Sequence, residues 1–158
     1  MRVGSPLSEK GAASSVDVSK RVGELWPDKW FDIARQFYRD HSRWLGSITA
    51  NGIGTFLEDI ETARLVSAAH SKELIRIMTW QKAGARRIPH YIEDWYDVAH
   101  KTGDGPPSVA DDVGLVYLDS GPVVVVILAN DIRGNYGEAE DAEGRLAQRI
   151  ARLFDGPR

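Results

Sequence analysis

The chain has 158 residues and no cysteine, which fits one modest domain and excludes disulfides, thiolate catalysis and cysteine-bound metals. Hydrophobic residues make up 42% and charged residues 27%, as in a soluble globular protein. The net charge is −3, so the chain lacks the basic surface that nucleic-acid binding requires.

The N-terminal part combines an unpatterned segment with a helix. Residues 1–20 are rich in Ser, Gly and Ala, so we expect an irregular arm there and a domain over 21–158. The arm has no apolar secretion-signal core, and no apolar run reaches the roughly 18 residues of a membrane span. The sequence as written therefore predicts a cytoplasmic protein that does not bind membranes. A helix follows, because apolar residues recur at helical spacing in Trp26, Trp30, Ile33, Ala34 and Phe37.

Two more helices are predicted before the middle of the chain. Thr49 is a suitable N-cap for a helix with an apolar face of Ile53, Phe56, Leu57 and Ile60. Ser67 is a suitable N-cap for a second helix with Leu74, Ile77 and Met78 turned inward.

The second half predicts three strands and a last helix. The strands are Asp97–Thr102, Val113–Leu118 and Val123–Ala129, and a short turn at Asp119-Ser120-Gly121 joins the last two as a hairpin. The last helix has an apolar stripe of Ala142, Leu146, Ile150, Leu153 and Phe154. This order predicts an α+β fold in which helices cover an antiparallel sheet.

The strand Val123–Ala129 is apolar at every position, which is typical of a strand buried on both faces. Its hairpin partner pairs with one edge, and the sequence offers no fourth strong strand for the other edge. An uncovered apolar edge is a template for association. We therefore expect the chain to self-associate or to pair with a missing N-terminal half.

The first strand ends in Lys101-Thr102-Gly103, which by itself could be a solvated lysine, a β-former and a turn glycine. The surrounding sequence is more specific: HKTGDG, then DVGLVYLDSGPVVVVILAND, then AEGRLAQRIARLF. Together with the upstream ITANGIGTFLEDIETARLVSAAHSKELIRIM, this pattern resembles the C-terminal part of class A β-lactamases and related penicillin-recognising serine hydrolases. The resemblance covers roughly residues 47–155.

The resemblance implies a role for each residue at the end of this strand, which lines one wall of the active site in the family. Lys101 would supply an ammonium to a substrate carboxylate, and Thr102 would donate its hydroxyl to the same carboxylate. Gly103 would let a β-lactam or related acyl substrate lie close to the backbone. The backbone N–H of Asp104 would match an oxyanion-hole donor, and one such donor is typically worth about 10²–10³ in rate.

Other parts of the family pattern are missing. The S-x-x-K nucleophile is absent, because the residues three before each lysine are Leu7, Asp17, Trp26, Ala69, Thr79 and Val98. There is no S-D-N tripeptide, and Glu24 is the only tempting candidate for the deacylating glutamate. The family is usually exported, yet no signal is present here. We therefore expect a C-terminal portion of a β-lactamase-like domain that is inactive alone; the alternative is a non-catalytic module that pairs through its open sheet edge.

The remaining polar residues predict neither a metal site nor a cofactor site. The histidines, which show no metal-ligand spacing, are expected at the surface or half-buried, at His41, His70, His90 and His100. A solvated loop is the expected setting of Asp111-Asp112, and a helix N-terminus that of the acidic run Glu138–Glu143. An inward-pointing Asp104 would repel an anionic ligand.

Overall fold

The computed structural model describes residues 32–33, 35–37, 39–40, 42 and 46–157. Its elements, in chain order, are α3 (Ala50–Glu61), α4 (Ala68–Thr79), β1 (Asp97–Gly105), β2 (Val109–Leu118), β3 (Gly121–Ala129) and α5 (Tyr136–Asp155). The predicted arm over residues 1–20 lies outside the described residues, as do Trp26, Trp30 and Ala34 of the first predicted helix. The described positions of that helix are helical, and Ile33 and Phe37 are exposed. Within these ranges, no helix has both the length and the apolar character to cross a membrane.

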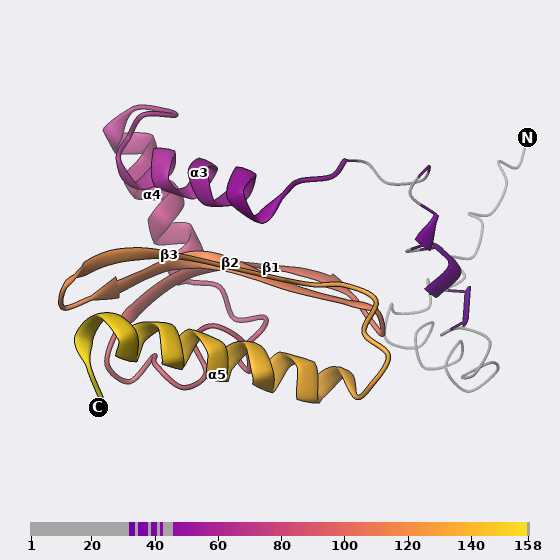
Figure 1. The fold of residues 1–158 in the computed structure, drawn as a ribbon. Helices are drawn as coiled ribbons and strands as arrows, with labels where there is room; N and C mark the ends of the chain where they lie inside the picture. The colour runs from indigo at the N-terminus through magenta and orange to yellow at the C-terminus, as the bar shows by residue number, and fades with distance from the viewer. Residues whose placement is uncertain (1–31, 34, 38, 41, 43–45, 158) are drawn as a thin grey trace, which may run out of the picture.

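The three strands form one antiparallel sheet in the order β1-β2-β3. Lys101 is opposite Val113, and Val113 is opposite Val126 across the central strand. Helices α3 and α4 cover one face of the sheet, and α5 covers the other together with the loop over residues 80–96 (Figure 1). The predicted α+β arrangement is confirmed, and each strand is longer than predicted.

The predicted starts of the first two described helices are confirmed by their caps. Thr49 Oγ1 accepts a hydrogen bond from the Gly52 N–H at 3.1 Å, and Ser67 Oγ accepts one from the His70 N–H at 3.3 Å. The predicted inward faces are only partly correct. Leu57, Ile60 and Met78 are buried, whereas the exposed large residues include Phe56, Leu74 and Ile77.

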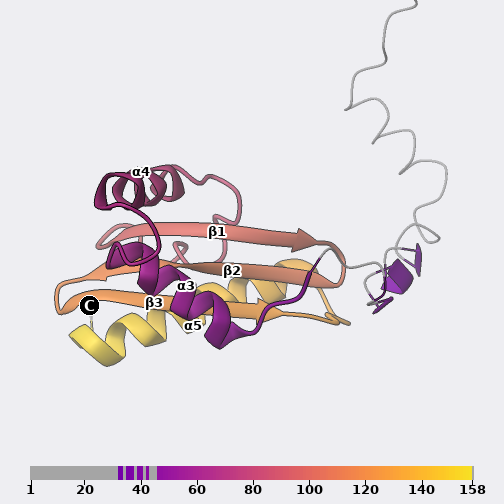
Figure 2. The same ribbon diagram turned by 90° about the horizontal axis from the view of Figure 1, so that it is seen from above.

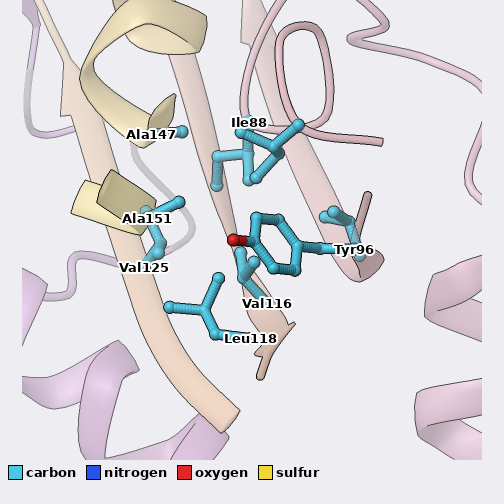
Figure 3. Close-up of a cluster of buried hydrophobic side chains, with 9 residues drawn as sticks. Ile88, Tyr96, Val116, Leu118, Val125, Ala147 and Ala151 are labelled. Carbon is cyan, nitrogen blue, oxygen red and sulfur yellow. The ribbon is translucent and has the colours of Figure 1, made fainter. Parts of the chain in front are cut away.

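Each face of the sheet has its own hydrophobic core. On the α3–α4 face, the buried residues are Leu57, Ile60, Met78, Ala99 and Leu115. On the α5 face, the core brings together the loop, the strands and α5 (Figure 3), with Ile88, Tyr96, Val116, Leu118, Val125, Ala147 and Ala151 among its members. Strand β3 contributes Val124 and Val126 to the first core and Val123 and Ile127 to the second. The predicted covering of this strand on both faces is confirmed.

The face of α5 that packs on the sheet differs from the predicted one. Its buried residues are Glu143, Gly144, Ala147 and Ala151, and Ile150 is half-buried against the same core. A Cβ at Gly144 would lie 2.8 Å from the carbonyl oxygen of Arg87, so α5 approaches the loop too closely for a larger residue. The predicted stripe is otherwise exposed; we call Leu146, Leu153 and Phe154 the α5 outer stripe.

Both outer strands of the sheet have an open side. Among the residues that the structure describes, β1 and β3 each pair only with β2. The expected lack of a second partner for β3 therefore holds for the described part of the chain. The predicted site residues Lys101 to Asp104 belong to β1 and so lie on a strand with one open side.

Candidate functional site

The predicted site residues occupy the second half of the edge strand β1, which Figure 2 shows along one side of the sheet. Successive side chains on a strand point to opposite faces. Ala99 belongs to the core on the α3–α4 face, so Lys101 lies on that face, where it is exposed. Val98 belongs to the core on the α5 face, so Thr102 lies on the opposite face, where it is buried.

The hydroxyl of Thr102 already has partners in the structure. It accepts a hydrogen bond from the Gln81 side-chain amide at 3.2 Å. A Cβ at Gly84, whose φ is +72°, would collide with the Thr102 methyl group, so only glycine fits there without strain. Lys101, on the other face, donates from Nζ to the Thr102 carbonyl oxygen at 2.5 Å.

The carboxylate of Asp104 points to the α5 face and away from the face of Lys101. It accepts hydrogen bonds from the Arg87 guanidinium and from the Tyr136 hydroxyl, the latter at 3.2 Å. Partial burial raises the pKa of Asp104, but the hydrogen bond and the positive charge of Arg87 more than offset this effect and lower it below its usual value. Because the charge of Asp104 is balanced by Arg87, this carboxylate would repel an anionic ligand on the Lys101 side only weakly.

Arg87 is the centre of a buried polar cluster under the sheet. Its guanidinium donates to the Asp111 carbonyl oxygen at 2.9 Å, to the Tyr136 hydroxyl at 3.0 Å and to Glu140 at 3.1 Å. Burial lowers the pKa of Arg87, but the hydrogen bond to Asp104 and the surrounding negative charges raise it by more. Arg87 therefore stays charged and joins β1, β2 and α5.

Glu143 on α5 is buried at the edge of this cluster. In the described part of the chain, neither of its carboxylate oxygens has a hydrogen-bond partner, and the nearest cation atom, Nε of Arg87, is 3.9 Å away. Burial raises the pKa of Glu143 to about 8, and the negative charges of Asp112, Asp111 and Glu140 act in the same direction. The side chain is therefore mostly protonated at neutral pH.

Two sequence predictions about polar residues are wrong. His100 is fully buried, and its Nδ1 lies 2.9 Å from Oδ1 of Asp112. Asp112 is also buried, in the central strand β2, where its Oδ2 accepts a hydrogen bond from the Ile88 N–H at 3.1 Å. Asp111-Asp112 is thus part of a strand that the sequence prediction began at Val113.

The supporting residues Arg87, Tyr136 and Gln81 were not identified from the sequence. The only available signal was the alternation along β1, which puts His100, Thr102 and Asp104 on one face. The carboxylate of Asp104 then needs a cation or hydrogen-bond donors on that face. The loop that supplies Arg87 has no periodicity from which its path could be read.

The fold is the C-terminal part of the β-lactamase fold, which defines a class A β-lactamase-like protein. The model of the family described as "Beta-lactamase enzyme family" matches residues 11–154, and the chain belongs to this family. No curated protein matches the sequence significantly.

Several solved β-lactamases are similar in structure. One from Chitinophaga pinensis is 25% identical, with a TM-score of 0.59, and the match covers 63% of this chain and 39% of that chain. A class A enzyme from Bacteroides cellulosilyticus is 15% identical, with a TM-score of 0.62 and coverages of 68% and 41%. For one from Sphaerobacter thermophilus the values are 19%, 0.57, 64% and 38%. The matched part thus spans about two fifths of each of these proteins.

Proposed function

We propose that this chain forms the substrate-binding wall of a β-lactamase-like serine hydrolase. The ligand is a β-lactam or a related acyl compound that carries a carboxylate. The observation that carries the proposal is the position of Lys101, exposed on an edge strand whose neighbouring carboxylate, Asp104, is bound by Arg87. The charge of Asp104 therefore does not oppose an anion that approaches the ammonium.

The ligand lies along the open side of β1, which both faces of the strand can reach. Lys101 approaches from the α3–α4 face and binds the carboxylate by a charge-assisted hydrogen bond. Thr102 approaches from the α5 face, and its hydroxyl exchanges a present partner for the ligand. Gly103 has no side chain to hold the ligand away, and the N–H of Asp104 donates to the acyl oxygen.

The chain alone does not catalyse the family reaction. Acylation needs an activated serine, and no serine lies three residues before a lysine in this sequence. An activated serine would have to be supplied from outside these 158 residues. A chain with this wall but without the nucleophile binds the substrate and leaves it intact.

A second candidate function is a non-catalytic module that pairs through the open side of β3. The supporting observations are the single strand partner of β3 among the described residues and the exposed α5 outer stripe. The occupant is a second copy of the chain or a missing N-terminal half.

Benzylpenicillin titration followed by amide NMR tests the first proposal. We expect shifts in Lys101 to Asp104 and roughly fivefold weaker binding for Lys101→Met, since one exposed ion pair is lost. Lys72→Met is the matched control, because Lys72 is exposed on α4. Equal weakening by both variants, or the absence of shifts in β1, would reject the substrate-binding wall.

The same samples test whether the chain alone is inactive towards β-lactams. Intact mass after incubation with penicillin should show no adduct, and a chromogenic cephalosporin should stay unhydrolysed. A stable adduct on a serine would show that the chain has its own nucleophile.

A further inference from the structure

Asp111 on the central strand lies on the same face of the sheet as Lys101. Val113 and Leu115 pack in the core on the α3–α4 face, and Asp111 comes two residues before Val113 on β2, so its side chain is on that face too. Asp111 is directly opposite Gly103, whereas Lys101 is opposite Val113. Lys101 and Asp111 are therefore diagonal neighbours on two paired strands, and such positions are about 7–8 Å apart.

The carboxylate of Asp111 leans across Gly103 toward the open side of β1. A Cβ added at Gly103 would lie 3.5 Å from Oδ2 of Asp111, so the absence of a side chain there leaves this oxygen accessible from that side. Asp111 and Leu128, its neighbour on β3, are both partly exposed. Helices α3 and α4 do not extend over this end of the sheet (Figure 2). A ligand bound along β1 can therefore reach the carboxylate.

The charge of Asp111 is only partly compensated by the protein. Its Oδ1 accepts a hydrogen bond from the Ala129 N–H at 3.0 Å, but in the described part of the chain no group donates to Oδ2. Burial raises the pKa of Asp111 by more than the Ala129 N–H and the charge of Arg87 lower it. Lys101 does not neutralise this carboxylate, because its Nζ donates to the Thr102 carbonyl oxygen and no ion pair joins Lys101 and Asp111 in that part of the chain.

We infer that the wall on β1 selects ligands that carry a cationic group beside their carboxylate, with Lys101 binding the carboxylate and Asp111 attracting the cation. The selection rests on the proposed function, because it needs a carboxylate bound by Lys101. The two side chains present opposite charges on one face, and the residue beside both is Gly103, which has no side chain. A ligand with both charges is attracted at each position, whereas a ligand with the carboxylate alone is repelled by Asp111.

Two cephalosporins with the same ring system and the same acylamino side chain are matched ligands for the test. Cephaloridine has a pyridinium group beside its carboxylate, where cephalothin has a neutral acetoxy group. The measurement is a titration of the full chain with each compound, followed by amide NMR. We expect shifts in Lys101 to Asp104 with both compounds, and about threefold to fivefold tighter binding of cephaloridine, the effect of one partly exposed charge.

Asp111→Asn should remove this preference. The side-chain amide oxygen can still accept from the Ala129 N–H, so the fold is kept, and cephalothin should bind the variant no more weakly than the wild type. Asp97→Asn is the control, because Asp97 is exposed on the same strand but lies at its opposite end. This control variant should keep the preference for cephaloridine.

The outcomes separate the selection by Asp111 from the wall itself. Equal affinity of the wild-type chain for both compounds, with shifts in β1, would reject the selection and leave the substrate-binding wall in place. A preference that persists in Asp111→Asn, or that Asp97→Asn removes to the same extent, would also reject the role of Asp111 alone. Binding of neither compound would reject the wall and, with it, the selection.

Discussion

The guanidinium of Arg87 is only 1% exposed, yet the Asp104 carboxylate that it binds is 45% exposed. One end of this ion pair is therefore inside the protein and the other end is at the surface, beside the candidate ligand wall. The two partners also differ in what else they bind, since Arg87 donates in addition to Glu140, to Tyr136 and to the Asp111 carbonyl oxygen. This asymmetry leads to the first prediction.

Replacing the buried partner should cost far more stability than replacing the exposed one. Arg87→Met leaves Glu140, which is 19% exposed, without its cation and removes the hydrogen bonds to Tyr136 and the Asp111 carbonyl oxygen; breaking a buried pair in this way typically costs about 3–5 kcal/mol. Asp104→Asn should cost less, since the amide oxygen can still accept from Arg87 and Glu140 stays beside the buried guanidinium. Urea unfolding measures both, with the exposed Arg86→Met as control. Equal losses for Arg87→Met and Asp104→Asn would contradict the central position of Arg87 in the cluster.

Glu143 should make the folded state less stable as the pH rises. Its pKa is about 8 in the folded chain and about 4.5 when unfolded, so the folded state holds the extra proton between these values. Stability therefore falls from about pH 4.5 to about pH 8 and is then level. Burial also raises the pKa of Asp111, which adds to the same trend, whereas Asp104, with its lowered pKa, acts below this window.

Glu143→Gln should remove most of this fall, because the amide has no proton to lose. The measurement compares unfolding midpoints at about pH 5 and about pH 9, with Glu138→Gln, exposed in the first turn of α5, as control. A wild-type profile that is flat between these values would show that Glu143 is ionised without penalty.

The close approach of α5 to the loop should be sensitive to a single methyl group. Gly144→Ala gains about 1 kcal/mol in helix propensity but places a Cβ 2.8 Å from the Arg87 carbonyl oxygen. Overpacking typically costs about 1–3 kcal/mol, so we expect a lower melting temperature. Gly134→Ala, with no atom within 4 Å of its added Cβ, should leave the melting temperature nearly unchanged. A higher melting temperature for Gly144→Ala would mean that α5 can move away freely.

The chain should associate with a second copy as its concentration rises. Strand β3 has one strand partner among the described residues, and Leu153 in the α5 outer stripe is 81% exposed. Light scattering should detect a dimer or larger species, and the double variant Leu153→Glu, Phe154→Glu should dissociate it. Arg149→Glu, on an exposed position of the same helix, is the control. A wild-type chain that stays monomeric at every concentration would leave the stripe without this role.

The secondary structure could be predicted because its signals are local. Thr49 and Ser67 cap the helices that they were expected to cap, and an unbroken apolar run identified β3. The packing face of α5 could not be predicted from hydrophobic periodicity, which favoured Leu146 and Leu153. The packing face of α5 is set by small side chains, because only a residue as small as Gly144 allows the helix to approach the loop.

The candidate site, like the fold, has one part that could be predicted from the sequence and one part that could not. The sequence predicted Lys101 near the end of a strand in an antiparallel sheet, and the structure confirms that placement. The partners of Asp104 could not be inferred, because Arg87 precedes it by 17 residues in an irregular loop and Tyr136 follows it by 32. His100 was misjudged because its partner, Asp112, lies on another strand and was expected in a loop.

The alternation along β1 also restricts how the length of this segment can change in evolution. Deleting one residue between Lys101 and Asp104 would put both side chains on the same face, so either the ammonium would enter the Arg87 cluster or the carboxylate would leave it. Either outcome brings like charges together or separates a buried cation from its partner. Length variation among relatives should therefore be concentrated in the turn between β1 and β2, where residues 106–108 are outside both strands.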